Sequence, residues 1–477
     1  MPVTTEHKQY TDNLDRWRRN RDAVAGEDAV KARREAYLPK KSVSQTREEY
    51  DAYLQRALYF NATGRTVEGL VGLMFRRDAA VVFPDAMQEI MDDVTLDGIS
   101  LQELTKQAAQ DAVIAGRGGI LVDYPTVDTK EVDNLRAYEK AGIRPYATYY
   151  SAEAITNWAE GRVGNSNVLT RVVLFEIEVE EKSNDEFESE EIKQYRVLDL
   201  TETGYRQRLF RLTNQGGSEG WTAVEEYYPL MNGKPLPYIP FEFIGPRYGE
   251  TSVQKSPITD LAITNISHFR TMADLENGRH WCGSPTPVFT GQFVSESGDE
   301  VTEVKLGSES GIHMSEGSDA KYMEFKGDGL GELREADQQK RDMMVVLGAR
   351  ILSPDKRQTE AAETALIHRA GENSTLASIA RSVSRSVTRI MEYLRDWSVG
   401  SGEVSCEINT DYMPTEMTPQ ELKETVAAWQ SGALSSIELF ERLKAGEIVR
   451  ADKSYDEHQA EVESDGPPLG TLGGGFD

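Results

Sequence analysis

The segment of residues 256–397 places the strongest constraint on the fold, because two long helical patterns enclose a stretch that no helix can cross. The first pattern begins at Ser256-Pro257, a suitable pair for an N-cap and a first helical turn, and continues to Trp281. Residues 282–291 then contain two prolines and two glycines, which interrupt any helix. Helical pattern returns near Leu330 and runs, with one break, to Trp397. A helix, a small projecting insert and a returning helix together predict an elongated subunit of a larger assembly.

Length and composition indicate a folded protein of more than one domain. A chain of 477 residues is too long to fold around a single hydrophobic core. Its 39% hydrophobic and 28% charged residues are typical of soluble proteins. No apolar run approaches the ~18 residues of a membrane span, and the N-terminus lacks the apolar core of a signal peptide. The two cysteines, Cys282 and Cys406, are far apart, which argues against a disulfide framework and agrees with a reducing compartment. From the lack of a long apolar run and of a signal-peptide core, we expect no membrane contact.

The formal net charge of −27 limits how this chain can meet nucleic acid. Sequence-independent binding neutralises phosphates with an excess of lysine and arginine, which this chain lacks. An acidic surface can nevertheless suit a passage through which DNA must slide without adhering. Solubility alone explains the charge equally well, so both interpretations stay open.

The N-terminal part of the chain reads as helical. We predict a helix around residues 12–21 with Trp17 as an anchor, and one helical region over residues 48–74 that its glycines weaken. Ser100 and Glu103 form a capping box that opens a further helix, which stops at the glycine run of residues 116–119.

A β-rich region follows. Residues 120–124 are strand-like, and short strands separated by turn signals continue from Pro145 to Phe243, as in an antiparallel sheet. The acidic run of residues 180–191 lies between two of these strands and is predicted to be an exposed hairpin tip. A cation site there is the less favoured alternative, because the acids lack regular ligand spacing.

Beyond the break at residues 353–359, which contains Pro354, a long helix is predicted from Glu360 onward. Its apolar residues recur every three or four positions and form a seam suited to near-coiled-coil packing: Leu376, Ile379, Val383, Val387, Ile390, Leu394 and Trp397. Residues 405–410 are strand-like. Capping boxes at residues 418–421 and 435–438 bracket a helical hairpin, and residues 461–477 are predicted to be disordered.

Motifs that carry chemistry are missing from the sequence. It contains no phosphate-binding loop, no zinc-ligand pattern and no nucleophile elbow. The glycine run of residues 116–119 follows a helix and precedes a strand, the reverse of a phosphate cradle, so a helix C-cap is the favoured interpretation. We expect no catalytic residues, no metal and no cofactor.

Two groups of cations stand out in this acidic chain. Arg381, Arg385 and Arg389 recur every four residues, roughly opposite the apolar seam of the long helix. They predict contact with a polyanion or with an acidic neighbouring subunit. The alternative is a helix face that is simply exposed to solvent. Lys356 and Arg357 lie in the polar break between two helices, which is either a simple turn or a tip that faces a channel.

Five segments carry a resemblance to a known family. They are residues 53–75, 97–101 (DGISL), 115–125 (AGRGGILVDYP), 258–270 (ITDLAITNISHFR) and 284–291 (SPTPVFTG). In these segments and in their order, roughly over residues 45–450, the chain resembles the portal proteins of tailed bacteriophages. No single motif is catalytic, so the order of the segments gives the resemblance its specificity.

The resemblance implies an α+β fold, an elongated multidomain subunit with a mixed α/β wing, a two-helix stem, a small α/β clip, a long tunnel helix and a helical crown. The implied division is listed by residue: wing 1–245, first stem helix 246–282, clip 283–327, second stem helix 328–350, tunnel loop and long helix 351–399, return strand to the wing 400–413, crown hairpin 414–460 and disordered tail 461–477.

The same resemblance implies a homo-oligomeric ring, usually of twelve subunits, at one capsid vertex of a virion assembled in the host cytoplasm. Double-stranded DNA would pass through its centre without sequence specificity, with Lys356 and Arg357 as channel candidates. The terminase packaging motor, neck or adaptor proteins and the capsid protein would be partners, with Lys305, Lys321 and Lys326 as docking candidates on the clip. Alternative interpretations are another virion assembly or neck component, or an acidic multidomain enzyme with an unrecognised site.

Overall fold

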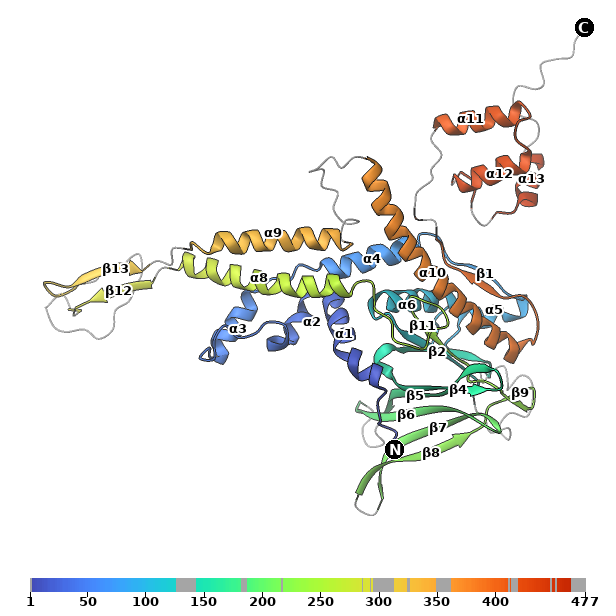
Figure 1. Ribbon diagram of the computed structural model, residues 1–477, viewed down its shortest axis with the longest axis horizontal. Helices are drawn as coiled ribbons and strands as arrows, with labels where there is room; N and C mark the ends of the chain where they lie inside the picture. Colours follow the sequence, from blue (N-terminus) through green and yellow to red (C-terminus); the bar gives the residue numbers. More distant parts are fainter. Residues whose placement is uncertain are drawn as a thin grey trace, which may run out of the picture. The chain divides into compact units, whose positions relative to one another are not determined.

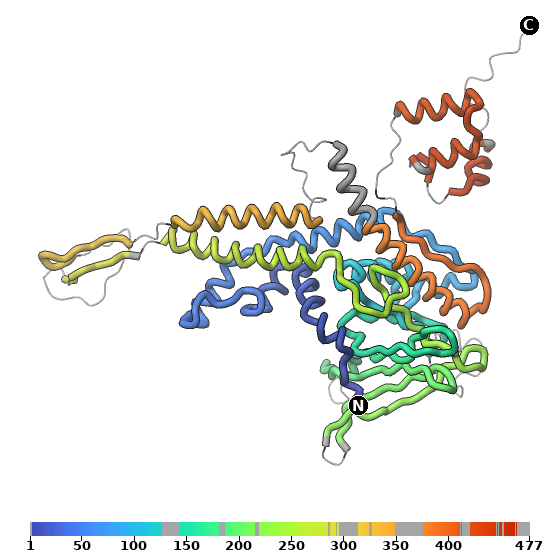
Figure 2. Tube along the Cα trace, viewed as in Figure 1, coloured from blue at the N-terminus to red at the C-terminus, as the bar shows by residue number. Residues whose placement is uncertain are grey.

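The structure is a computed structural model that describes residues 2–125, 143–181, 187–215, 218–284, 286–291, 293–294, 313–323, 327–348, 362–410, 412, 419–446, 448–450 and 453–464. The chain divides into two compact units, Met1–Thr410 and Asp411–Asp477 (Figures 1 and 2). Over the described residues, no helix has both the length and the apolar character needed to cross a membrane. The first unit mixes helices with several small sheets.

The N-terminal helices are α1 (Lys8–Ala25), α2 (Glu27–Ala32), α3 (Arg47–Arg56) and α4 (Ala62–Met74). Trp17 is fully buried in α1, which confirms it as an anchor. The single helical region predicted over residues 48–74 is wrong, because the chain turns extended at Ala57 and a new helix begins after Asn61. The Asn61 side chain accepts a hydrogen bond from the Gly64 amide at 2.8 Å, so a local cap restarts the helix.

Helix α8 (Thr259–Gly283) is covered on one side by the segment from α2 to α4. Its Ile266, Phe269 and Ala273 form one apolar cluster with residues of that segment, so part of the predicted wing packs on the predicted stem helix. The helix starts at Thr259, two residues later than predicted. The Ser256 hydroxyl donates a hydrogen bond to the Val113 carbonyl of α6 (Leu101–Ile114) at 2.7 Å, which fixes the turn before α8 to α6.

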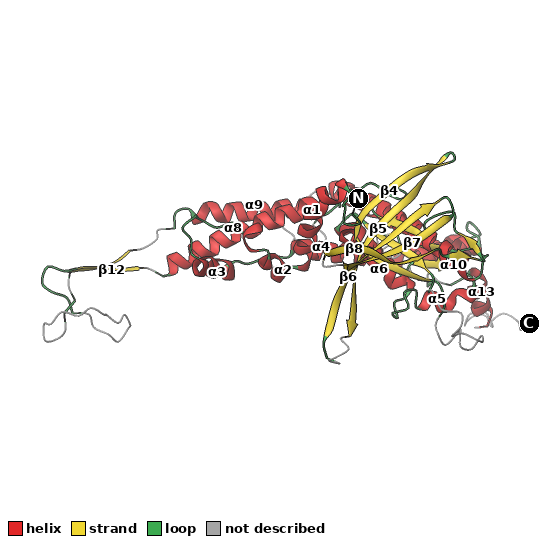
Figure 3. Ribbon diagram, turned by 90° about the horizontal axis from the view of Figure 1, so that it is seen from below, coloured by secondary structure: helices red, strands yellow, loops and turns green. Residues whose placement is uncertain are grey.

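A five-stranded antiparallel sheet forms the β-rich region, as predicted. Its strands in spatial order are β4 (Ile155–Val163), β5 (Ser166–Glu181), β6 (Ser189–Thr201), β7 (Gly204–Gln215) and β8 (Ser218–Tyr227) (Figure 3). Strands β5 and β6 pair as far as Glu181 and Ser189, so the acidic run belongs to a hairpin as predicted. Residues 182–186 of that run lie outside the described residues.

A second sheet, of three antiparallel strands, joins distant parts of the chain. Strand β2 (Gly118–Asp123) lies between β3 (Tyr146–Ser151) and β11 (Phe241–Ile244). Helix α6 (Leu101–Ile114) leads into β2 and begins with the predicted capping box, in which Ser100 and Glu103 bond each other's backbone amides. Minor elements are β1 (Ala80–Val82), α5 (Gln88–Asp92), β9 (Leu230–Met231), β10 (Lys234–Pro235) and the 3-10 turns at Arg34–Ala36, Asp85–Met87 and Ala152–Ala154.

Helix α9 (Leu330–Val346) runs beside α8, and a β-hairpin connects the two helices (Figures 1 and 3). The hairpin contains β12 (Thr286–Thr290) and β13 (Asp319–Met323), which pair antiparallel. Helix, short strands and returning helix are therefore present in the order predicted from the sequence. The break predicted at residues 353–359 lies outside the described part of the chain.

Helix α10 (Ala362–Ser398) buries the predicted apolar seam, from Leu376 to Leu394, with Trp397 partly buried. The seam packs on β11, α6 and β14 (Ser405–Glu407) of its own chain, rather than along a second long helix as near-coiled-coil packing would require. Small serines make this close approach possible. The hydroxyls of Ser382 and Ser386 donate to backbone carbonyls at the end of β11, at 2.8 and 3.3 Å.

The second unit consists of α11 (Pro419–Gln430), α12 (Ser436–Ala445) and α13 (Tyr455–Ser464). The first two are the predicted hairpin, and the capping box at residues 435–438 is confirmed. The capping box predicted at residues 418–421 involves Thr418, which is not described. Helix α13 was not predicted, and it corrects the expected start of disorder at residue 461. Its signal is a capping box between Ser454 and Glu457.

Gly116 supports a testable prediction about the turn between α6 and β2. Its φ is +71°, and a Cβ added there would lie 2.9 Å from the backbone oxygen of Gln254. We expect Gly116→Ala to lower the free energy of unfolding by about 1–3 kcal/mol, because both strain and contact oppose the side chain. The matched control is Gly72→Ala at an exposed position of α4, where nothing lies within 4 Å and helix propensity favours alanine by about 1 kcal/mol. Equal Tm changes in the two variants would contradict this reading of the turn.

Candidate functional site

Helix α9 is attached to α8 mainly by a polar cluster. Nε2 of the fully buried His268 lies 2.7 Å from Oδ1 of Asp337, although the two atoms lack the alignment of a hydrogen bond. Burial lowers the pKa of His268, and the nearby Asp337 carboxylate only partly opposes this. The other oxygen of Asp337 forms an ion pair with Arg341, whose Nε lies 3.0 Å away. Met344 is the only fully buried residue of α9, so these charges contribute much of the contact.

Lys340 adds a second polar attachment in the same helix pair. Its ammonium group donates to the Ser267 carbonyl at 3.1 Å and contacts the Thr271 hydroxyl of α8. Burial lowers the pKa of Lys340. Leu330 of α9 packs closely on Gly278 of α8, so a Cβ added at Gly278 would clash with the leucine side chain.

Lys321 is the one predicted docking residue that the described residues include. It lies in β13, is exposed and pairs in register with Val288 of β12. The hairpin also exposes Tyr322 and Met323. Lys305 and Lys326 lie outside the described residues, as do the channel candidates Lys356 and Arg357, so the structure does not bring these predicted residues together.

The three predicted arginines of α10 occupy different environments. Arg381 and Arg385 are exposed, and no acidic partner contacts either one among the described residues. Arg389 is half-buried, donates to Glu392 at 2.5 Å and lies 4.7 Å from the centre of the Tyr393 ring. Burial alone would lower the pKa of Arg389, but hydrogen bonds to Glu392 and Tyr393 outweigh it and raise the pKa. The uniform stripe expected from sequence is therefore two surface cations and one satisfied ion pair.

Glu242 of β11 faces this end of α10 and was not singled out in the sequence. Burial raises its pKa to about 7, Arg389 opposes the increase and Glu392 adds to it. No local signal marked this carboxyl, because the alternation of Phe241, Glu242 and Phe243 places the glutamate on the face opposite its aromatic neighbours, as in a half-exposed strand.

Arg117 is a second buried charge that sequence reasoning missed. Its guanidinium lies between the rings of Trp158 and Phe243, at 4.0 and 4.2 Å. One nitrogen donates to the Thr251 carbonyl at 2.9 Å, and its Nε and Nη2 find no hydrogen-bond partner among the described residues. Burial lowers the pKa of Arg117 to about 9. The residue belongs to the glycine run of residues 116–119 and joins the two sheets through cation–π contact.

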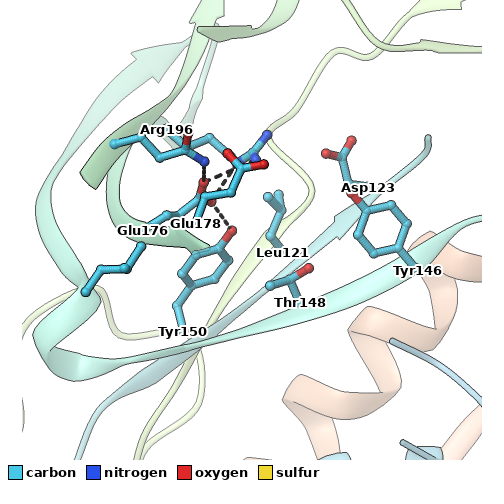
Figure 4. A pocket seen from close by; sticks show the side chains of 10 residues that line it. Leu121, Asp123, Tyr146, Thr148, Tyr150, Glu176, Glu178 and Arg196 are labelled. Atoms are coloured by element: carbon cyan, nitrogen blue, oxygen red, sulfur yellow. Dashed lines mark hydrogen bonds and ion pairs between the residues drawn. The ribbon is translucent and has the colours of Figure 1, made fainter. Parts of the chain in front are cut away.

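A polar pocket of about 300 Å³ lies between β3 and the β5–β6 hairpin (Figure 4). Arg196 donates to both carboxylate oxygens of Glu176, at 2.7 and 3.2 Å, and the Tyr150 hydroxyl donates to Glu176 at 2.6 Å. Burial alone would raise the pKa of Glu176, but Arg196 reverses this and holds it below the usual value. Asp123, across the pocket in Figure 4, accepts from Gln207 at 2.8 Å, and burial raises its pKa.

The pocket charges are thus mutually satisfied, which favours a structural role in seating β5–β6 on β3. Among the described residues, no group of three or more histidine, cysteine, aspartate or glutamate side chains is arranged to hold a metal ion.

Comparisons with known proteins give a partial match. Residues 257–398, less than half of the chain, match the family model described as "Domain of unknown function (DUF4055)". No curated protein matches the sequence.

Three solved structures are similar to the chain at low scores. One is "Neck of empty GTA particle computed with C6 symmetry", with a TM-score of 0.38 and 10% identity over 84% of this chain and 90% of that chain. A second is "Virion of native gene transfer agent (GTA) particle", with a TM-score of 0.37 and 11% identity over 85% of this chain and 96% of that chain. The third is "Neck of native GTA particle computed with C12 symmetry", with a TM-score of 0.36 and 12% identity over 80% of this chain and 89% of that chain. At such scores the likeness does not define function.

The buried carboxyl of Glu242 predicts a specific pH dependence of stability. Its pKa is raised from 4.5 to about 7 in the folded chain, so the folded state holds a proton that the unfolded state releases. Stability from this group is therefore present at low pH and is lost as pH rises through this window. We expect Glu242→Gln to remove that loss, which amounts to about 3 kcal/mol at most.

Thermal unfolding of both proteins at about pH 5 and about pH 8 measures the effect. The exposed Glu225→Gln variant is the control and should follow the unmodified chain. Parallel Tm changes for Glu242→Gln and the unmodified chain would show that this carboxyl is not the titrating group.

Proposed function

We propose that this chain is a subunit of a portal ring, the conduit for DNA at one capsid vertex of a phage-like virion. The observation that carries the proposal is the order of elements. Helix α8, the β12–β13 hairpin, helix α9, residues 349–361, helix α10, strand β14 and a helical unit follow one another as in the family that the sequence segments resemble. We infer a mechanical role with no chemical step.

The pairing of α8 with α9 supports the assignment of these helices as the stem. The hairpin at the end of the pair presents exposed side chains, including Lys321, Tyr322 and Met323. Such a mixture of apolar and charged groups suits a docking surface for the terminase motor or a neck protein. We therefore assign the hairpin as the clip.

Strand β14 supports the assignment of a return from the long helix to the wing. It pairs antiparallel with β1, so that Ala80 lies opposite Glu407. The N–H and the carbonyl of Cys406 are also close to the Thr388 hydroxyl of α10, at 3.0 and 3.4 Å. The helix and the returning strand are thereby held as one packed layer, and the helical unit after residue 410 is assigned as the crown.

Another virion assembly or neck component is the alternative within the same class. The exposed hairpin and the polar helix pair suit any such subunit, and ring closure around a DNA-wide hole distinguishes the portal from it. An enzyme is the alternative from another class. Charges in the pocket between β3 and the β5–β6 hairpin are paired with one another, as in Arg196 and Glu176, which favours the structural proposal.

Particle mass and shape test the portal proposal directly. We expect the purified chain to form closed rings, visible in electron-microscopy class averages, with a hole wide enough for duplex DNA. Mass photometry counts the subunits. A chain that stays monomeric or dimeric, alone and with its virion partners, would overturn the proposal.

The channel assignment yields a separate prediction. We expect Lys356→Glu combined with Arg357→Glu to leave ring formation intact and to impair DNA retention or packaging, because sparse cations at a constriction attract the phosphate backbone. The control introduces the same charge change at the exposed Arg162 and Lys234. Packaging is measured as nuclease-protected DNA per particle. Equal packaging in the two variants would remove Lys356 and Arg357 from the channel.

A further inference from the structure

Helices α8 and α9 lie side by side (Figure 1), and a polar contact separates two apolar ones along their length. At one end Leu330 packs on Gly278, and towards the other end Met344 is fully buried. Between them the imidazole of His268 in α8 meets the carboxylate of Asp337 in α9. The middle of the helix pair therefore depends on the charges of these two groups.

The structure favours the neutral form of His268. Its side chain is fully buried, and its Nε2 lies 2.7 Å from Oδ1 of Asp337. Two lone pairs would repel at this separation, so the one proton of the neutral ring lies on Nε2. Nδ1 finds no hydrogen-bond partner among the described residues. A second proton would enter at Nδ1 and bury a charged donor without an acceptor, which is costly.

Charges on α9 oppose the second proton as well. The Nε of Arg341 lies 3.0 Å from the other oxygen of Asp337, so this carboxylate already has a cationic partner. The ammonium group of Lys340 donates to the carbonyl of Ser267, the residue before His268. A protonated His268 would therefore be the third cation beside one carboxylate.

The loop before α4 covers another side of the imidazole with an aromatic ring. The centre of the Phe60 ring lies 6.2 Å from that of His268. Arg65 and Arg341 each place a guanidinium carbon 5.8 Å from the Phe60 ring, so this ring already faces two cations. Among the described residues, Asp337 is the one carboxylate that contacts His268. The other charged groups near the cluster belong to α8 and act on Lys340 with opposite signs: Arg270 and Asp274.

We propose that His268 is an acid-sensitive latch, in which uptake of a proton at Nδ1 releases α9 from α8. Release exposes the apolar contacts made by Leu330 and Met344, so acid makes this surface available to other molecules. The latch goes beyond the portal proposal and does not depend on it, because both helices belong to one chain.

The titration of His268 agrees in sign with this geometry. Burial lowers its pKa, Asp337 opposes the decrease, and Arg341 and Lys340 add to it. The folded chain therefore holds this proton less tightly than the unfolded chain does. Stability from the neutral ring is present above the ordinary histidine pKa of about 6.5 and is lost as the pH falls from there toward the lowered value.

Hydrogen exchange of the full-length chain measures the opening of α9. The amides of Leu330–Val346 are followed at about pH 7.5 and about pH 5.5, after correction for the intrinsic pH dependence of exchange. We expect the open fraction of α9 to rise up to about tenfold at the lower pH, because a released histidine with a pKa of about 6.5 favours the open state by that factor. The amides of α6, which contains no histidine, are the internal reference.

The variant His268→Gln tests the latch itself. Glutamine can still donate towards Asp337, but it takes up no proton in this pH range. We expect the acid-induced opening of α9 to disappear. The matched control is His280→Gln, an exposed position near the end of the same helix, which should respond as the unmodified chain does. An equal acid-induced rise in His268→Gln and in the unmodified chain overturns the proposal.

A second variant retains His268 and keeps the test informative if glutamine disturbs the core. Arg341 is exposed, and Arg341→Gln frees the Asp337 carboxylate to pair with a protonated ring. We expect the acid-induced rise to shrink to about threefold or less. Arg334→Gln makes the same charge change at an exposed position of α9 and should leave the tenfold response of about pH 5.5 intact. Equal responses of the two arginine variants contradict the proposed charge balance, and tighter closure of α9 in acid reverses its sign and defeats it.

Discussion

The close approach of α10 to the β-layer is the constraint on which the first unit depends. Ser382 and Ser386 bond the end of β11, while the Ser384 hydroxyl accepts from the Ile408 amide at 2.9 Å. Larger side chains would hold the helix away and leave these backbone groups unsatisfied. The serines alternate with Arg381 and Arg385, so tight packing on one face directs the arginines outward. One short sequence thereby sets both the core and the surface chemistry.

Arg117 fixes the two sheets to each other by a different means. Its guanidinium fills the space between Trp158 of the five-stranded sheet and Phe243 of the three-stranded sheet. His7 stacks on the same Trp158 ring at 3.9 Å, so the N-terminus closes over the contact. A buried cation without a carboxylate is costly, and two aromatic faces offset part of that cost. The position of the five-stranded sheet therefore depends on this residue.

Local signals allowed much of the fold to be predicted, and tertiary contacts explain the rest. Capping boxes and turn residues predicted α6, α12 and the β-hairpins, because these interactions span only a few residues. The break before Asn61 was missed because the apolar spacing continues across it. The apolar seam of α10 was recognised from its helical spacing, but that spacing does not show which element packs against the seam. At the candidate sites, Arg381 and Arg385 were predictable as exposed, whereas the burial of Arg117 and Glu242 follows only from the packed aromatic residues around them.

The helix pair α8–α9 shows why this fold suits an assembly. Helix α9 buries one residue fully, Met344, and depends on His268, Asp337 and Lys340 for much of its contact with α8. Polar contacts give direction but little net stability, because each group exchanges water for protein. A helix of this kind retains exposed apolar residues, here Met343 and Val346. Burial of those residues against further protein would add stability, which agrees with the assembly proposed above.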